Sequence, residues 1–133
     1  MNAGTVLLIK DFKFQDGTQK DKLLIVLNNP KDDEPFLLCP ATSQQWRKSK
    51  ILGCHSDDNY FYIDENQDKF LKNTWIVFHK LYSYSAALIV KESFQQNLFK
   101  KFAIEPTLWQ AIKNCILQSK DIEIEYLEMI KRN

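Results

Sequence analysis

The sequence predicts a mainly β domain with C-terminal helices, an α+β class in which a small, strongly bent barrel carries packed helices. Short β-branched and aromatic runs recur from Thr5 to Phe78, and a clear amphipathic helical pattern begins only at Pro106. The 133 residues are 44% hydrophobic and 13% aromatic, which is enough to bury one core. We therefore expect a single domain over residues 1–133, with the barrel at about 4–90 and the helical part at about 92–131.

The first strands have the clearest patterns. Thr5–Ile9 is a β-branched and aliphatic run, and alternation in the next segment puts Phe12 and Phe14 on one face. The pair Asp16–Gly17 is a turn signal. Leu23–Leu27 is continuously apolar, which is typical of a strand buried on both faces.

Shorter strands follow an exposed loop at residues 28–35, which holds two prolines and four charges. We expect strands at Phe36–Cys39 (ended by Pro40), Ile51–Cys54, Tyr60–Ile63 and Thr74–Phe78. Residues 87–90 fit either a strand or the start of a helix and are assigned to a strand. Residues 92–102 are assigned to a helix.

Two C-terminal helices are expected. Pro106 is suited to the first helical position. The residues after it form an apolar stripe at helical spacing, namely Leu108, Ala111, Ile112, Cys115 and Ile116. Residues 122–131 form the second helix, although the alternation at 122–126 also permits a strand.

Composition excludes several classes of protein. The formal net charge of +1 excludes a protein held on nucleic acid by its overall field. No apolar run approaches the roughly 18 residues of a membrane span, and the start does not resemble a signal peptide. The three cysteines have no CxxC spacing, which suits a reducing, cytoplasmic location, and Cys39 and Cys115 fit small core residues. No metal-ligand spacing or nucleotide-binding motif is present, so we expect no cofactor and no metal.

Two parts of the sequence resemble the PemK/MazF/Kid toxin family. The first comprises Gly4-Thr-Val-Leu-Leu-Ile-Lys-Asp-Phe, Asp16-Gly17 and Lys22-Leu-Leu-Ile-Val-Leu-Asn-Asn29; the second is Pro40-Ala41-Thr42-Ser43. The resemblance implies a small SH3-like barrel of the PemK/MazF type, usually a homodimer. It also implies metal-independent cleavage of single-stranded RNA and an antitoxin protein as partner.

In that chemistry the RNA 2′-hydroxyl attacks the adjacent phosphate, leaving a 2′,3′-cyclic phosphate and a 5′-hydroxyl end. By the resemblance, Thr42 and Ser43 would hydrogen-bond the scissile phosphate. Lys22 stands where the family has Arg and would neutralise the phosphate, without the bidentate geometry of a guanidinium. The family's later Arg-Cys-Asp-Gln segment has no match, and the segment ending in His79 and Lys80 stands near that place.

Other polar residues are candidates from their chemistry. An imidazole ordinarily titrates near neutral pH, so His55 and His79 could transfer protons; the alternative is a surface histidine bonded to its neighbours. Trp46, Arg47 and Lys48 form a strip that could hold RNA by charge and stacking, with Lys80 as a further cation; the alternative is a solvated loop.

The sequence therefore predicts an endoribonuclease, the toxin of a type II toxin–antitoxin or related mobile-element system. Because the family's Arg is absent, a non-catalytic module of the same fold, binding nucleic acid or a partner protein, is the alternative. A third possibility is an interaction protein that dimerises through its C-terminal helices.

Overall fold

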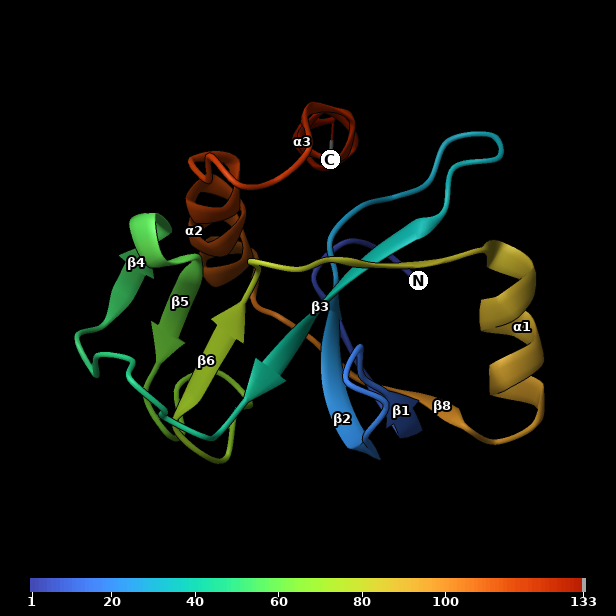
Figure 1. Cartoon of the computed structure of the whole chain (residues 1–133), viewed down its shortest axis with the longest axis horizontal. Coiled ribbons are helices and arrows are strands. Elements are labelled where there is room, and N and C mark those ends of the chain that lie inside the picture. The colour runs from blue at the N-terminus through green and yellow to red at the C-terminus, as the bar shows by residue number, and fades with distance from the viewer. Residues whose placement is uncertain (133) are drawn as a thin grey trace.

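The computed structural model describes residues 1–132, which form one open antiparallel sheet with three helices (Figure 1). The strands are β1 (Thr5–Lys13), β2 (Gln19–Val26), β3 (Phe36–Thr42), β4 (Gly53–His55), β5 (Tyr60–Ile63), β6 (Thr74–Val77), β7 (Tyr82–Tyr84) and β8 (Leu98–Ala103). The helices are α1 (Ala86–Phe94), α2 (Pro106–Leu117) and α3 (Ile124–Lys131). The sheet order is β4-β5-β6-β3-β2-β1-β8, with β7 also paired to β3. The mainly β, α+β class is confirmed.

The strand β2 is buried on both faces, as its sequence predicts. Ile25 of β2 and Leu27 directly after the strand pack in a core with residues of α2 and α3. Leu24 and Val26 point to the opposite face and pack in a second core that includes Ile89 of α1. The alternation of one strand therefore joins two hydrophobic cores through a single sheet.

The strand β3 runs through Pro40, so the expected end at Cys39 is wrong. Pro40 is paired with Leu24 of β2. On its other side β3 pairs with β7 at residues 36–38 and with β6 at residues 41–42. Pro40 lies between these two pairings, so its missing N–H interrupts no ladder on that side.

Residues 86–103 correct two further expectations. The segment 87–90 is helical, because the Ser85 side chain accepts a hydrogen bond from Leu88 N (3.1 Å) and caps α1. The helix then ends at Phe94, near Gln96 with its positive φ of 62°. The chain returns as β8, which pairs with β1. The division into a barrel before residue 90 and helices from 92 is therefore wrong, since β8 belongs to the sheet.

The expectations for α2 and α3 are confirmed, and the strand expected at Ile51–Cys54 is shifted. Four of the five stripe residues of α2 are buried, and only Ala111 is exposed. Ile51 is 70% exposed, and β4 begins at Gly53. Among the described residues, no helix combines the length and apolarity that crossing a membrane requires.

A disulfide joins Cys54 of β4 to Cys115 of α2, which corrects the expectation of reduced thiols. Cys54 is exposed and Cys115 is buried, and the bond closes a span of 61 residues. Widely spaced cysteines gave no indication of this pairing, because only the packing of α2 on β4 brings them together. Cys39 is a free, buried thiol, and burial raises its pKa.

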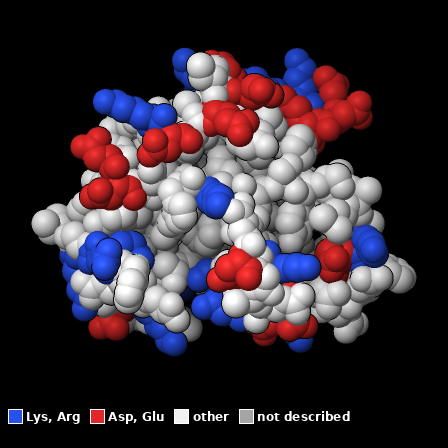
Figure 2. All heavy atoms as spheres, viewed as in Figure 1, with Lys and Arg blue, Asp and Glu red and all other residues white. Residues whose placement is uncertain are grey.

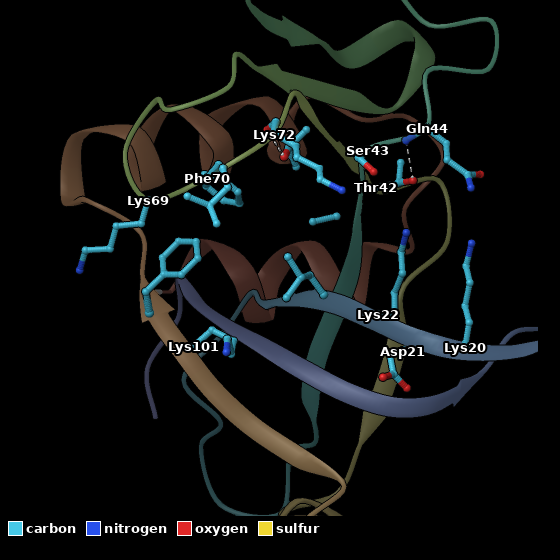
Figure 3. A pocket seen from close by; sticks show the side chains of 15 residues that line it. Lys20, Asp21, Lys22, Thr42, Ser43, Gln44, Lys69, Phe70, Lys72 and Lys101 are labelled. Carbon is cyan, nitrogen blue, oxygen red and sulfur yellow. Dashed lines mark hydrogen bonds between the residues drawn. The ribbon is translucent and has the colours of Figure 1, made fainter.

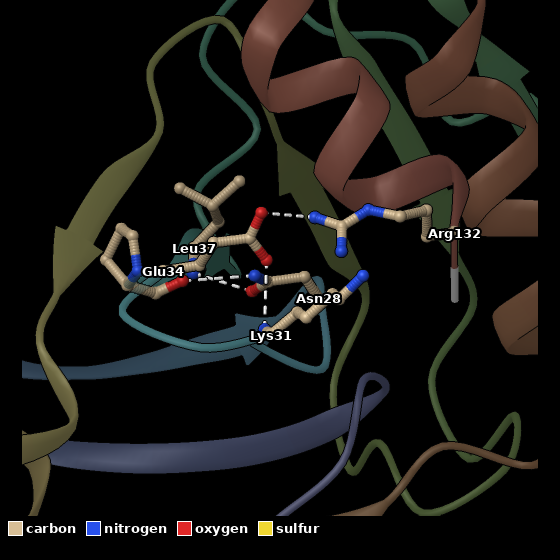
Figure 4. Close-up of polar contacts among 6 residues, drawn as sticks. Asn28, Lys31, Glu34, Leu37 and Arg132 are labelled. Atoms are coloured by element: carbon tan, nitrogen blue, oxygen red, sulfur yellow. Dashed lines mark hydrogen bonds and ion pairs between the residues drawn. The ribbon is translucent and has the colours of Figure 1, made fainter.

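Two polar contacts fix the loop between β2 and β3 (Figure 4). The fully buried Asn28 donates to the Pro35 carbonyl (3.0 Å) and accepts from Leu37 N (2.8 Å). At the surface, Arg132 forms an ion pair with Glu34 and so links the end of α3 to this loop. The buried amide satisfies both backbone groups where the β2–β3 ladder ends.

We expect Asn28→Ala to lower the free energy of unfolding by about 1–3 kcal/mol, because it leaves a buried backbone N–H and a carbonyl unpaired. Urea titration measures the change. Asn114→Ala, at an exposed position of α2, should stay within about 0.5 kcal/mol of the parent. Equal effects of the two substitutions would contradict the role assigned to Asn28.

The thiol pairing predicts the outcome of alkylation. In denaturant without a reductant, only Cys39 should react; after reduction all three cysteines should react. Cys54→Ser should instead give two reactive thiols without reduction, because Cys115 loses its partner. Mass spectrometry counts the alkyl groups, and three labels on the unreduced parent would contradict the pairing.

Candidate active site

A cavity of about 540 Å³ opens where β2, the end of β3 and β8 meet the segment before β6 (Figure 3). Its lining includes an apolar part made by Leu23, Ala41, Phe70 and Phe102. The polar lining consists of Lys20, Lys22, Lys69, Lys72, Lys101, Asp21, Thr42, Ser43, Gln44 and Thr74, with Leu71 beside them. The cavity therefore combines an apolar surface with five lysines and one carboxylate.

The register of β2 and β3 brings Lys22 and Thr42 together. Leu23 pairs with Ala41, and continuing this register by one residue places Lys22 opposite Thr42. Figure 3 shows Lys22 directed toward Thr42. The Thr42 hydroxyl oxygen accepts a hydrogen bond from Gln44 N (3.1 Å), which orients it and leaves its O–H able to donate.

The position of Lys22 follows from the pattern of the sheet face. The face of the sheet that carries Lys22 also carries Ile9, its partner on β1, and Ile9 belongs to the core that includes Ile89 of α1. A separate cluster contains Tyr62 and Trp75, and Trp75 pairs with Thr42. Lys22 and Thr42 thus form a polar interval between two apolar clusters on one sheet face.

Lys22 is partly buried and surrounded by like charge. Its pKa is lowered to about 8, first by burial and then by the neighbouring Lys20 and Lys48. Within residues 1–132, its ammonium group forms no ion pair with a carboxylate. The nearby Asp21 extends from the opposite side of β2, where its Oδ1 accepts a hydrogen bond from Asp11 N (3.0 Å).

The loop after β3 brings Lys48 to this site. Trp75 Nε1 donates to the Ser49 carbonyl (2.8 Å), and the Tyr60 hydroxyl accepts from Ser49 N (2.9 Å). These bonds hold the neighbouring Lys48 with its Nζ 5.9 Å from the centre of the Trp75 ring. Burial also lowers the pKa of Lys48.

Two other residues of the expected RNA-binding strip lie further out. Trp46 is 76% exposed, and the Arg47 guanidinium lies 5.4 Å from the centre of its ring. The exposed indole and guanidinium together offer a surface for a base and a phosphate. They do not line the cavity.

The two histidines occupy different places. His55 stacks on Tyr60 (4.6 Å between ring centres), with Nε2 2.7 Å from the Ile51 carbonyl. Strands β5 and β6 separate it from β3, so the structure does not bring it to Lys22. His79 lies after β6, and its pKa is lowered by burial, then by Lys80 and Lys48. Neither histidine lines the cavity, although His79 shares Lys48 as an electrostatic neighbour with Lys22.

Sequence reasoning missed four of the cavity lysines, Lys20, Lys69, Lys72 and Lys101. Lys20 could have been found, because it lies two residues before Lys22 in one strand and shares its face. The other three come from segments that meet β2 only in the folded chain. Figure 2 shows acidic side chains gathered toward the upper margin, where α3 lies, and many of the lysines and arginines lower on the same face. A net charge near zero thus conceals a local basic site.

Within residues 1–132, no group of three or more His, Cys, Asp or Glu side chains is placed to hold a metal ion. Compared with models of protein families and with curated proteins, the chain matches none.

Lys22→Met should raise the thermal midpoint at pH 7. The folded state lowers the pKa of Lys22 from 10.5 to about 8, so between these values the unfolded state binds more protons. The charged Lys22 therefore lowers the stability of the folded state by its full amount below about pH 8, and this loss of stability disappears as the pH approaches 10.5. The advantage of Lys22→Met over the parent should therefore shrink as the pH rises through this window.

Lys13→Met, at an exposed position of β1, is the matched control and should show no such pH-dependent difference. Thermal melts of the three proteins from pH 7 to 10.5 make the comparison. A constant difference between Lys22→Met and the parent across this range would contradict the lowered pKa.

Proposed function

We propose that the protein is a metal-independent endoribonuclease that cleaves single-stranded RNA, as the toxin of a type II toxin–antitoxin or related mobile-element system. One observation carries the proposal. The two segments that resemble the PemK/MazF family contribute Lys22, Thr42 and Ser43 to the same cationic cavity. Residues that share a chemical role in the resemblance are therefore neighbours in space.

The cavity suits a phosphodiester group. A phosphate beside Lys22 would supply the negative counter-charge that this ammonium group lacks within residues 1–132. Thr42 and Ser43 can donate hydrogen bonds to the phosphate oxygens. During transesterification the 2′-oxygen bonds to phosphorus as the bond to the 5′-oxygen breaks. Negative charge develops on the phosphorane, and cations and donors already in place stabilise it.

The surroundings suit the rest of an RNA strand. The apolar lining near Phe102 can contact a ribose or base, and the exposed Trp46 can stack on a neighbouring base, worth about 1–3 kcal/mol. Arg47, Lys48 and Lys80 would hold flanking phosphates. The lysines of the cavity rim extend this path toward β8.

The proposal includes the finer features of the family. The bent sheet would be an SH3-like barrel of the PemK/MazF type, left open between β4 and β8. The protein would act as a homodimer and be neutralised by an antitoxin. A cytoplasmic location would require the Cys54–Cys115 disulfide to persist in a reducing compartment. The order of the early strands, with β1, β2 and β3 as sheet neighbours, supports the likeness.

The alternative is a non-catalytic module that binds nucleic acid or a partner through the same cavity. Lys22 favours it, because an ammonium group at this position lacks the bidentate contact that a guanidinium makes with phosphate. Such a module would retain binding without cutting RNA.

Incubation with a long single-stranded RNA in EDTA tests the proposal. We expect discrete cuts with 2′,3′-cyclic phosphate and 5′-hydroxyl ends, identified by end-specific sequencing. Thr42→Val, which removes a donor at similar shape, should lower the cleavage rate by about 10²–10³-fold. Thr107→Val, on α2 outside the cavity, is its control.

Intact RNA bound by folded protein would instead support the non-catalytic module. Cleavage unaffected by Thr42→Val would contradict the site even if the protein is a ribonuclease. Absence of both cleavage and RNA binding would contradict the proposal and leave only the partner-protein form of the alternative.

A further inference from the structure

The lysine at position 22 differs chemically from an arginine in a way that the cavity makes important. A guanidinium group cannot lose its proton in a protein, whereas an ammonium group can. We propose that the neutral amine of Lys22 accepts the 2′-hydroxyl proton during RNA cleavage. This inference rests on the proposed function and makes Lys22 the base of the reaction; the ammonium group formed by the proton transfer then stabilises the charge on the phosphorane.

The location of Lys22 meets the first requirement of a base, which is access to the reacting group. Its side chain lines the cavity opposite Thr42 and is directed toward that hydroxyl. An RNA phosphate held by Thr42 and Ser43 would bring the adjacent ribose to the same place. The amine and the 2′-hydroxyl can then come within hydrogen-bond reach.

The charges around Lys22 meet the second requirement, a substantial neutral fraction. Lys20 faces it from its own strand and Lys48 from the loop after β3, and both lower its pKa. Lys69 and Lys72 before β6 and Lys101 on β8 line the other walls of the cavity, and Figure 3 shows Lys69 directed away from Lys22. The one carboxylate of the lining, Asp21, extends from the other side of β2.

With its pKa at about 8, Lys22 is neutral in about one tenth of the molecules at pH 7. An ordinary lysine, with a pKa of 10.5, would be neutral in fewer than about one in a thousand. Burial and like charge thus increase the amount of usable base by a factor of a few hundred.

The histidines are less well placed for this proton transfer. His55 is stacked on Tyr60 beyond β5 and β6. His79 faces Lys48 and Lys80, and it does not line the cavity. Lys22 is the titrating group that both lines the cavity and lies opposite Thr42.

The step balances as follows. The lone pair of the Lys22 Nζ takes the 2′-hydroxyl proton, and the 2′-oxygen forms its bond to phosphorus. The bond between phosphorus and the 5′-oxygen breaks, and a water molecule at the open mouth protonates the departing 5′-oxygen. The resulting hydroxide and the Lys22 ammonium proton recombine as water after the cyclic phosphate leaves. Lys20 and Lys48 remain charged throughout and stabilise the phosphorane.

The test is the pH dependence of kcat/KM in EDTA, measured for the parent and for Lys22→Arg. Lys22→Arg keeps the positive charge but cannot supply a neutral base near pH 8. For the parent we expect a tenfold rise per pH unit below about pH 8 and a plateau above it. Lys22→Arg should retain RNA affinity within about threefold but lose at least about 100-fold in kcat and lose the inflection.

Lys91→Arg, on the exposed surface of α1, is the matched control and should keep the parent profile. If the parent cleaves RNA and Lys22→Arg keeps its kcat and inflection, the inference is overturned while the proposed function stands. If the folded parent does not cleave RNA, the proposed function fails, and the inference fails with it.

A second measurement does not depend on cleavage. Trace acylation of the folded protein at increasing pH, read lysine by lysine by mass spectrometry, reports the neutral fraction of each amine. Lys22 should become reactive with a midpoint near pH 8, well below the 10.5 of an ordinary lysine. Equal midpoints for Lys22 and Lys91 would overturn the inference.

Discussion

The burial of β2 on both faces is the constraint on which the rest of the structure depends. Its apolar residues must alternate between the core under α2 and α3 and the core that includes Ile89 of α1. This requirement fixes the register with β1 and β3, because a slip of one residue would exchange the two faces. The same register places Lys22 where one apolar cluster ends, opposite Thr42, so the packing of the sheet and the geometry of the cavity have one origin.

The sequence predicted the features that depend on local pattern. The hairpin turn at Asp16–Gly17, the doubly buried β2 and the helices at the C-terminus follow from alternation, turn chemistry and helical spacing. Errors arose where tertiary pairing determines the outcome. Pro40 fits inside β3 because the adjacent pairing changes there from β7 to β6. The strand β8 follows a short helix, and its pairing with β1, far away in the sequence, was not visible locally.

The residues of the candidate site also fall into those that the local sequence predicts and those that only the folded structure brings together. Lys22, Thr42 and Ser43 could be named from the sequence, and the fold brings them to one cavity. The surrounding lysines of the β5–β6 segment and of β8 could not be named from the sequence, because no local pattern relates them to β2. His55 looked equivalent to His79 in sequence, yet the sheet order separates His55 from β3. The bond between Cys54 and Cys115 likewise exists only because α2 packs against β4.

A near-neutral chain can still hold a strongly basic site because its charges are unevenly distributed. Lysines converge on the cavity, whereas α3 and the segment before it carry acidic residues. Placing Lys22 among other cations opposes folding, and within residues 1–132 no carboxylate forms an ion pair with it. The two cores on the opposite faces of β2 offset that cost. An apolar residue would pack more favourably at this position between Ile9 and Thr42. A group that opposes folding where it stands, yet lines a cavity suited to an anion, is best explained by what it does to that anion.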